Sequence, residues 1–175
     1  MKVLVTAATK HGATWEIAEA IGAVLREEGL DARVLAPEDV ASVDGYDAVV
    51  LGSAVYAARW LRPARELVQR AADDFAERQV WLFSSGPIGD PPKPQEDPED
   101  IPDIMQATGA RGHRLFAGRL ARSRLTFLER TMAVAMRVPD GDYRDWAGIR
   151  RWAMGIAEAM RAEASRSTQA PRAPR

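Results

Sequence analysis

The sequence of 175 residues contains no cysteine and two histidines, His11 and His113. The missing cysteines exclude disulfides, cysteine nucleophiles, iron–sulfur ligation and thiol redox chemistry. Two histidines argue against a catalytic zinc site, which usually takes three protein ligands. We therefore expect no metal centre, and any redox function must depend on a bound organic cofactor.

The sequence also lacks a long hydrophobic run. No stretch approaches about 18 consecutive apolar residues, and the N-terminus enters a predicted strand without a charged and then apolar leader. These absences predict a cytoplasmic protein. With 46% hydrophobic residues the chain can form one domain with a sizeable core. We place this domain at residues 1–164 and expect a disordered polar tail at residues 165–175.

The two parts of the chain carry opposite charge. Residues 1–100 hold 10 Lys and Arg against 18 Asp and Glu, whereas residues 101–175 hold 14 against 7. Such an asymmetry can steer an acidic partner, an anionic substrate or a membrane surface toward the basic part.

Strand and helix signals alternate along the chain. Short apolar runs predict strands buried on both faces, and residues with apolar side chains at helical spacing predict the helices between them. The expected strands are residues 3–6, 32–35, 48–52, 80–84 and 114–117, and the expected helices are residues 14–28, 63–76 and 146–164, with a short helical piece at 37–43. This alternation predicts a doubly wound α/β fold with helices on both faces of a five-stranded parallel sheet of order 2-1-3-4-5.

A small polar loop, residues 9–14, lies where the first expected strand passes to the first helix. The first N–H groups of a helix have no internal partner and carry partial positive charge, and the hydroxyls of Thr9 and Thr14 add donors. Gly12 is the loop's one glycine, so the loop has neither a Walker nor a dinucleotide pattern. The loop fits a single terminal phosphate, such as that of FMN, with little need for a counter-cation. The alternative is an ordinary turn in which Thr14 is the N-cap.

Ligands of such sheets bind beyond the carboxyl ends of the strands, where the strand order reverses. Three loops of small residues lie at that edge. We expect the cofactor to contact Thr9, Lys10, His11, Gly12, Ala13 and Thr14, then Ser53, Ala54, Val55, Tyr56 and Ala57, and then Ser85, Gly86, Pro87, Ile88 and Gly89. Tyr56 is the preferred residue to stack on a flat ring, and the alternative is that Tyr56 and Trp60 cover the end of the core. No side chain has a clear acid or base role.

Taken together, these residues resemble the flavodoxins, and more closely the flavodoxin-like branch that includes menaquinone-dependent protoporphyrinogen oxidase. The resemblance covers most of the chain. It rests on T-K-H-G-A-T-W-E-I-A at residues 9–18, on Y-D-A-V-V-L-G-S-A-V-Y at residues 46–56, and on F-A-G-R-L at residues 116–120.

The resemblance implies a flavodoxin-like fold that binds FMN without a covalent bond. It places the phosphate at residues 9–14 and the flavin ring between residues 53–57 and 85–89. Two features depart from the family pattern. Ala8 stands where the family commonly has a hydroxyl, and residues 85–89 lack the aromatic side chain that flavodoxins place on the second ring face.

Two further segments bear on what the flavin would do. Residues 87–102 hold six prolines and five acidic residues, so we expect an extended segment that is either a flap beside the cofactor or a solvated loop. Residues 119–138 show the pattern of a basic amphipathic helix. We favour packing of its apolar side on the sheet, and the alternative is contact with a membrane surface or a quinone.

The sequence as a whole favours an FMN-binding flavodoxin-like redox protein that transfers electrons through its flavin. We expect a redox partner protein or a quinone, and no nucleic acid. Peripheral contact through residues 119–138 would place the protein at the inner membrane face. The resemblance leaves one alternative, a quinone-linked protoporphyrinogen oxidase, which is an FMN-dependent oxidoreductase. Another alternative, of a different class, is a cofactor-free flavodoxin-fold protein that binds partners.

Overall fold

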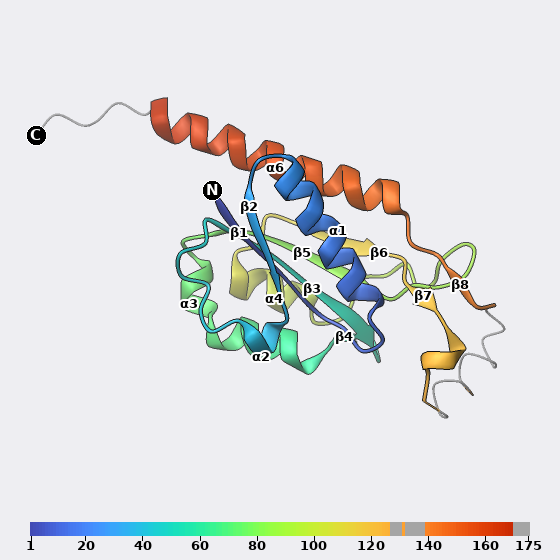
Figure 1. The fold of residues 1–175 in the computed structure, drawn as a ribbon. Helices are drawn as coiled ribbons and strands as arrows, with labels where there is room; N and C mark the ends of the chain where they lie inside the picture. Colours follow the sequence, from blue (N-terminus) through green and yellow to red (C-terminus); the bar gives the residue numbers. More distant parts are fainter. Residues whose placement is uncertain (127–130, 132–138, 170–175) are drawn as a thin grey trace, which may run out of the picture.

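The computed structural model describes residues 1–126, 131 and 139–169 of the chain. Its centre is a parallel sheet with the strand order β2-β1-β3-β5-β6 (Figure 1). These strands are β1 (Lys2–Ala8), β2 (Asp31–Leu35), β3 (Ala48–Tyr56), β5 (Gln79–Ser85) and β6 (His113–Phe116). In order of sequence they are the five predicted strands, so the predicted order 2-1-3-4-5 and the doubly wound α/β fold are confirmed.

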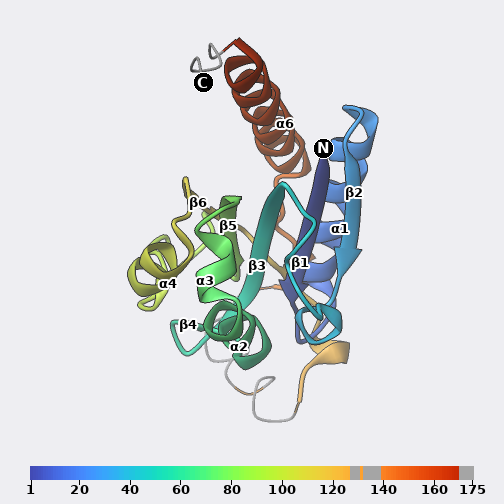
Figure 2. The same ribbon diagram turned by 90° about the vertical axis from the view of Figure 1, so that its left-hand side faces the viewer.

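Helices cover both faces of this sheet. One face carries α1 (Ala13–Glu27) and α6 (Trp146–Gln169), and the other carries α2 (Arg62–Arg70), α3 (Ala72–Phe75) and α4 (Ile101–Thr108) (Figures 1 and 2). Because helices lie on both sides, the central strands are almost entirely buried, as their continuous apolar runs predict.

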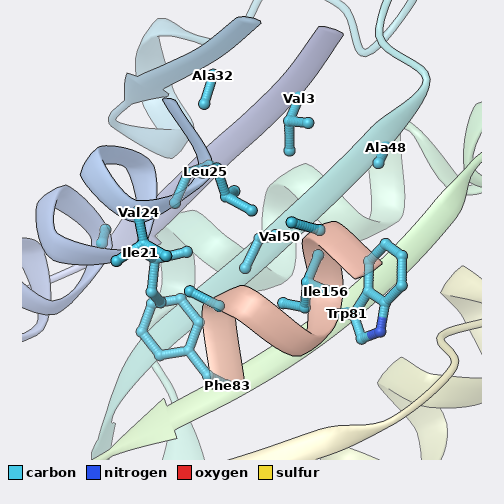
Figure 3. Close-up of a cluster of buried hydrophobic side chains, with 14 of the residues drawn as sticks. Val3, Ile21, Val24, Leu25, Ala32, Ala48, Val50, Trp81, Phe83 and Ile156 are labelled. Carbon is cyan, nitrogen blue, oxygen red and sulfur yellow. The ribbon is translucent and has the colours of Figure 1, made fainter. Parts of the chain in front are cut away.

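Side chains alternate between the two faces along β1 and divide the core. Val3 and Val5 point to the side of α1 and α6, whereas Leu4 points to the side of α2. The cluster on the side of α1 and α6 contains Ile21 of α1, Ile156 of α6 and Phe83 of β5 (Figure 3). The packing fixes α1 against the sheet and so sets where its N-terminus lies.

Between residues 37 and 108 the helices differ from the prediction in three places. The helix expected over residues 63–76 is divided into α2 and α3 at Ala71, whose backbone leaves the helical region. The piece expected at 37–43 is a single 3-10 turn, η1 (Pro37–Asp39). No helix is predicted where α4 lies, and α4 begins with Ile101 and Pro102 at the end of the proline-rich segment. Proline is compatible with the first turn of a helix, so that segment can pass directly into α4.

The single helix predicted over residues 119–138 is wrong at its start. There β7 (Arg119–Leu120) pairs in antiparallel fashion with β8 (Gly141–Asp142), and a 3-10 turn, η2 (Arg122–Arg124), follows β7. A helical wheel uses spacing alone and cannot detect pairing with a distant segment. Residues 127–130 and 132–138 of the predicted helix lie outside the described residues.

The last helix is longer than predicted. It continues to Gln169, so the tail expected from residue 165 begins inside α6, and residues 170–175 lie outside the described part of the chain. Within the described residues, no helix has both the length and the apolar character needed to cross a membrane.

Candidate functional site

The turn between β1 and α1 presents backbone amides that no side chain caps. Gly12 is the N-cap residue of α1 and has a φ of 87°, a conformation that glycine adopts readily. Its own N–H donates to the Oγ1 of Thr9 at 3.0 Å. Thr14 lies inside the first turn of α1 and is buried. The interpretation of Thr14 as the N-cap is therefore wrong, and the first N–H groups of α1 remain suited to an anion.

The three predicted loops meet around one cavity of about 300 Å³. It lies at the carboxyl ends of β1, β3 and β5, where doubly wound sheets bind ligands. The predicted residues that line it are Thr9, Lys10, His11, Ala13, Thr14, Ala54, Val55, Tyr56, Ala57, Ser85, Gly86 and Ile88. Six residues that the prediction did not include complete the lining: Lys93, Pro94, Gly118, Arg119, Leu120 and Leu125.

Four predicted residues do not line this cavity: Gly12, Ser53, Pro87 and Gly89. Two of them hold neighbouring loops in place. The Oγ of the buried Ser53 accepts a hydrogen bond from the N–H of Leu61 at 2.9 Å. The carbonyl of Pro87 accepts one from the N–H of Gly118 at 2.6 Å. Ser53 and Pro87 therefore hold neighbouring segments in place without lining the cavity themselves.

Two glycines allow the end of β3 and the loops after β5 and β6 to approach closely. A Cβ atom on Gly86 would lie 3.2 Å from the Cβ of Val55, and one on Gly118 would lie 3.4 Å from the carbonyl oxygen of Gly86. Gly118 belongs to the F-A-G-R-L segment, residues 116–120, that carries part of the family resemblance. That segment was the signal that could have placed Gly118, Arg119 and Leu120 at the site.

Tyr56 presents its ring at the cavity wall. It ends β3, and the two residues that follow, Ala57 and Ala58, both have positive φ values of 49° and 59°, as in a tight turn between antiparallel strands. The Nζ of Lys10 lies 4.6 Å from the centroid of the Tyr56 ring, and the ring of His11 lies 6.3 Å from it. Tyr56 is 36% exposed, so its ring borders both the cavity and the solvent.

Trp60, in contrast, covers the end of the core. It lies in β4 (Arg59–Trp60), which pairs with the end of β3, and its Nε1 donates to the Oγ of Ser84 at 2.7 Å. The same Oγ lies 2.8 Å from the Nε2 of His113, whose Nδ1 lies 3.2 Å from the carboxylate of Asp97. Burial lowers the pKa of His113, and Asp97 opposes this shift. Because Ser84 is fully buried, this serine–histidine–aspartate series has no access to a substrate.

The proline-rich segment, residues 87–102, is fastened to the domain and forms one wall of the cavity. The N–H of Glu99 donates to the carbonyl of Ala58 at 2.9 Å, and the carboxylate of Asp100 accepts a hydrogen bond from the N–H of Trp60 at 3.0 Å. Three residues of this segment, Ile88, Lys93 and Pro94, are among those that line the cavity. The extended acidic segment is therefore part of the candidate site.

A buried guanidinium joins the C-terminal part of the chain to the first turn of α1. The side chain of Arg144 is 2% exposed. Its Nη1 donates to Glu16 at 2.9 Å and to the carbonyl of Ala13 at 3.0 Å, and its Nε and Nη2 donate to Asp142 at 2.7 and 2.6 Å. Arg119, on the cavity wall, pairs with the same Glu16 at 2.9 Å.

These contacts shift the pKa values of the network. Partial burial raises the pKa of Glu16, but the hydrogen bonds and charges of Arg144 and Arg119 outweigh it, so this pKa lies below 4.5. Hydrogen bonds from Arg144 likewise hold the pKa of Asp142 below 3.8, against the effect of burial. Burial lowers the pKa of Arg144, and its bonds to the two carboxylates raise it overall. All these groups are therefore charged at neutral pH.

Comparison with known proteins decides the family. Residues 4–145 match the family model described as Flavodoxin domain. The chain belongs to the flavodoxin domain family. Membership of this family implies FMN as the cofactor. The cavity at the start of α1 is lined by residues that the sequence predicts to contact it. No curated protein matches the chain.

Solved structures share the flavodoxin fold over most of the chain. A flavodoxin from the domain Archaea is 20% identical, with 92% of this chain and 99% of that chain covered and a TM-score of 0.63. A cysteine-to-serine mutant of flavodoxin from Pseudomonas aeruginosa is 16% identical, with 92% and 99% covered and a TM-score of 0.58. The rubredoxin oxygen:oxidoreductase of Desulfovibrio gigas is 14% identical over 93% of this chain and 37% of its own, with a TM-score of 0.63. At these identities the likeness establishes the fold.

Proposed function

We propose that this chain binds FMN without a covalent bond in the cavity at the start of α1 and transfers electrons through the flavin. The observation that carries the proposal is the uncapped N-terminus of α1, which opens onto a cavity lined by small and apolar residues, one tyrosine and the cationic side chains of Lys10, Lys93 and Arg119. A phosphate needs N–H donors, and a flavin ring needs close backbone approach and a flat or apolar surface. The cavity offers both, so its residues fit FMN.

Each part of the cavity has a role in this proposal. The hydroxyl of Thr9 and the amides of Ala13 and Thr14 would hold the phosphate. Tyr56 would offer its ring to one face of the flavin, and Gly86 would allow the backbone to reach its edge. The bound flavin supplies the redox chemistry, and the protein supplies orientation, apolar cover and nearby charge.

We further propose that the electron donor or acceptor is a partner protein. Tyr56 is partly exposed at the wall of the cavity, so a ring stacked against it would lie close to the molecular surface. A flavin in that position can exchange electrons with a docked protein without a separate substrate pocket. The membership in the flavodoxin domain family supports this choice.

The two alternatives have less support. The matched family is the flavodoxin domain, and the solved structures above are two flavodoxins and a rubredoxin oxygen:oxidoreductase, so none of them supports protoporphyrinogen oxidation. The quinone or membrane contact expected through residues 119–138 stays a prediction, because most of that segment lies outside the described residues. A cofactor-free protein would leave the uncapped amides of α1 and the cavity beside them without a role.

Titration of the purified chain with FMN tests the proposed function. We expect one FMN to bind per chain, with absorbance bands near about 375 and 450 nm that remain with the protein after gel filtration. Tyr56→Leu should change the flavin spectrum and weaken binding, because it removes the aromatic surface. Tyr46→Leu is the control, since Tyr46 precedes β3, whereas Tyr56 ends it, and Tyr46 does not line the cavity. Colourless protein that takes up no FMN contradicts the proposal.

A further inference from the structure

Arg124 lies over the turn that begins α1, although it is distant in the sequence. It is the last residue of η2, in the segment that follows β6 and β7. Its Nη1 donates to the carbonyl oxygen of His11 at 3.1 Å. The same atom would lie 3.4 Å from a Cβ on Gly12, the N-cap residue of α1. The guanidinium of Arg124 therefore lies beside the N-cap residue of α1, although Arg124 is not among the residues that line the cavity.

Arg124 differs from the nearby Arg119 and Arg144 in the groups that accept its hydrogen bonds. Arg119 and Arg144 share the carboxylate of Glu16, and Arg144 also binds Asp142. Arg124 donates instead to a neutral carbonyl, and within the described residues no carboxylate forms an ion pair with it. Its positive charge adds to the partial charge at the N-terminus of α1 and favours an anionic group there.

We propose that Arg124 pairs with the terminal phosphate of the bound flavin. The inference rests on the proposed function. A cation from the segment after β6 thus completes a site whose N–H donors come from α1. The amides and hydroxyls of residues 9–14 alone predict little need for a counter-cation, and Arg124 lies outside that loop. A guanidinium presents paired N–H donors that match two oxygens of a phosphate, so Arg124 would discriminate FMN from riboflavin, which lacks this group.

Equilibrium binding of FMN and of riboflavin, followed by flavin fluorescence, tests this assignment. We expect Arg124→Gln to weaken FMN binding about tenfold and to leave riboflavin binding within about twofold. Arg124→Lys should give an intermediate loss, because a lysine keeps the charge without the paired donors. The affinity of the wild-type chain for FMN should fall more steeply with ionic strength than that of Arg124→Gln.

Arg150→Gln is the matched control. Arg150 is an exposed arginine that pairs with Glu27 at the far end of α1, so its removal should change neither affinity. An unchanged affinity for FMN in Arg124→Gln, or an equal loss for FMN and riboflavin, overturns the assignment of Arg124. If the wild-type chain binds neither flavin, the proposed function fails and this assignment fails with it. A wild-type preference for FMN over riboflavin that is undiminished in Arg124→Gln overturns this assignment alone.

Discussion

Arg144 donates from its Nη1 to the Oε2 of Glu16 at 2.9 Å, across 128 residues of sequence. The arginine is almost completely buried, whereas the side chain of Glu16 is 38% exposed. The contact fastens the segment before α6 to the first turn of α1, next to the cavity. A guanidinium is stable in this position because carboxylates meet it from two sides.

Removal of this arginine should lower the free energy of unfolding. Arg144→Met leaves Glu16 and Asp142 without their shared cation, and we expect a loss of about 2–4 kcal/mol in urea denaturation followed by circular dichroism. Arg150→Met removes an exposed ion pair with Glu27 and should cost less than about 1 kcal/mol. Similar losses in the two variants would contradict the role assigned to Arg144.

The stability of the wild-type chain should fall in acid. The pKa values of Glu16 and Asp142 lie below 4.5 and 3.8 in the folded chain. As the pH falls, these two carboxylates therefore bind protons in the unfolded chain before they do so in the folded chain. Their contribution to the free energy of unfolding is present above the unfolded-state pKa values, and it is lost as the pH falls through the lower pKa values of the folded chain. Denaturation measured between about pH 7 and about pH 3 should show a smaller decline in Arg144→Met than in the wild type. Equal declines argue against this coupling.

Ser84 should matter for stability and not for catalysis. Ser84→Ala leaves the Nε1 of Trp60 and the Nε2 of His113 without their common partner in a buried position, and we expect a loss of about 1–3 kcal/mol in unfolding free energy. Ser165→Ala removes an exposed hydroxyl from α6 and should change stability by less than about 0.5 kcal/mol. A fully stable Ser84→Ala protein would show that the hydrogen-bonded series is not structural.

Gly52 allows the ring of Phe83 to pack against β3. A Cβ on Gly52 would lie 2.2 Å from the Cζ of Phe83, so Gly52→Ala should destabilise the fold by about 1–3 kcal/mol in thermal or urea unfolding. Adding Phe83→Leu to that variant should recover part of the loss, since it removes the clash. Gly155→Ala, with nothing within 4 Å in α6, should be neutral or stabilising by up to about 1 kcal/mol. No recovery in the double variant would point to another cause.

The sequence predicts those parts of the molecule that depend on local pattern. The apolar runs at β1, β3 and β5 are continuous because both faces are covered, so their positions and order follow from the sequence. The boundaries are less well predicted. For example, the apolar run predicts that β3 ends at residue 52, but β3 continues to Tyr56. Residues 53 and 54 pair with the parallel neighbours of β3, and its last two residues pair with the antiparallel β4. Such pairing is a tertiary effect.

Residues that reach the site from distant segments could not be predicted from local pattern. Arg124 and Arg144 contact the start of α1 from far along the chain, and nothing in their immediate sequence distinguishes them from surface arginines. Lys93 and Pro94 lie in a segment whose composition is typical of a solvated loop, yet they line the cavity. Long-range packing, and not periodicity, places these four residues.

The most direct test of FMN binding at the start of α1 is a titration of the chain with FMN in which the amide N–H chemical shifts are measured by nuclear magnetic resonance. We expect the largest changes at residues 12–14, 53–57 and 85–89, except Pro87, which has no N–H, and we expect inorganic phosphate alone to shift the signals of residues 12–14. Changes confined to other parts of the molecule, or no change at all with excess FMN, would contradict the claim that α1 and the neighbouring loops hold the flavin.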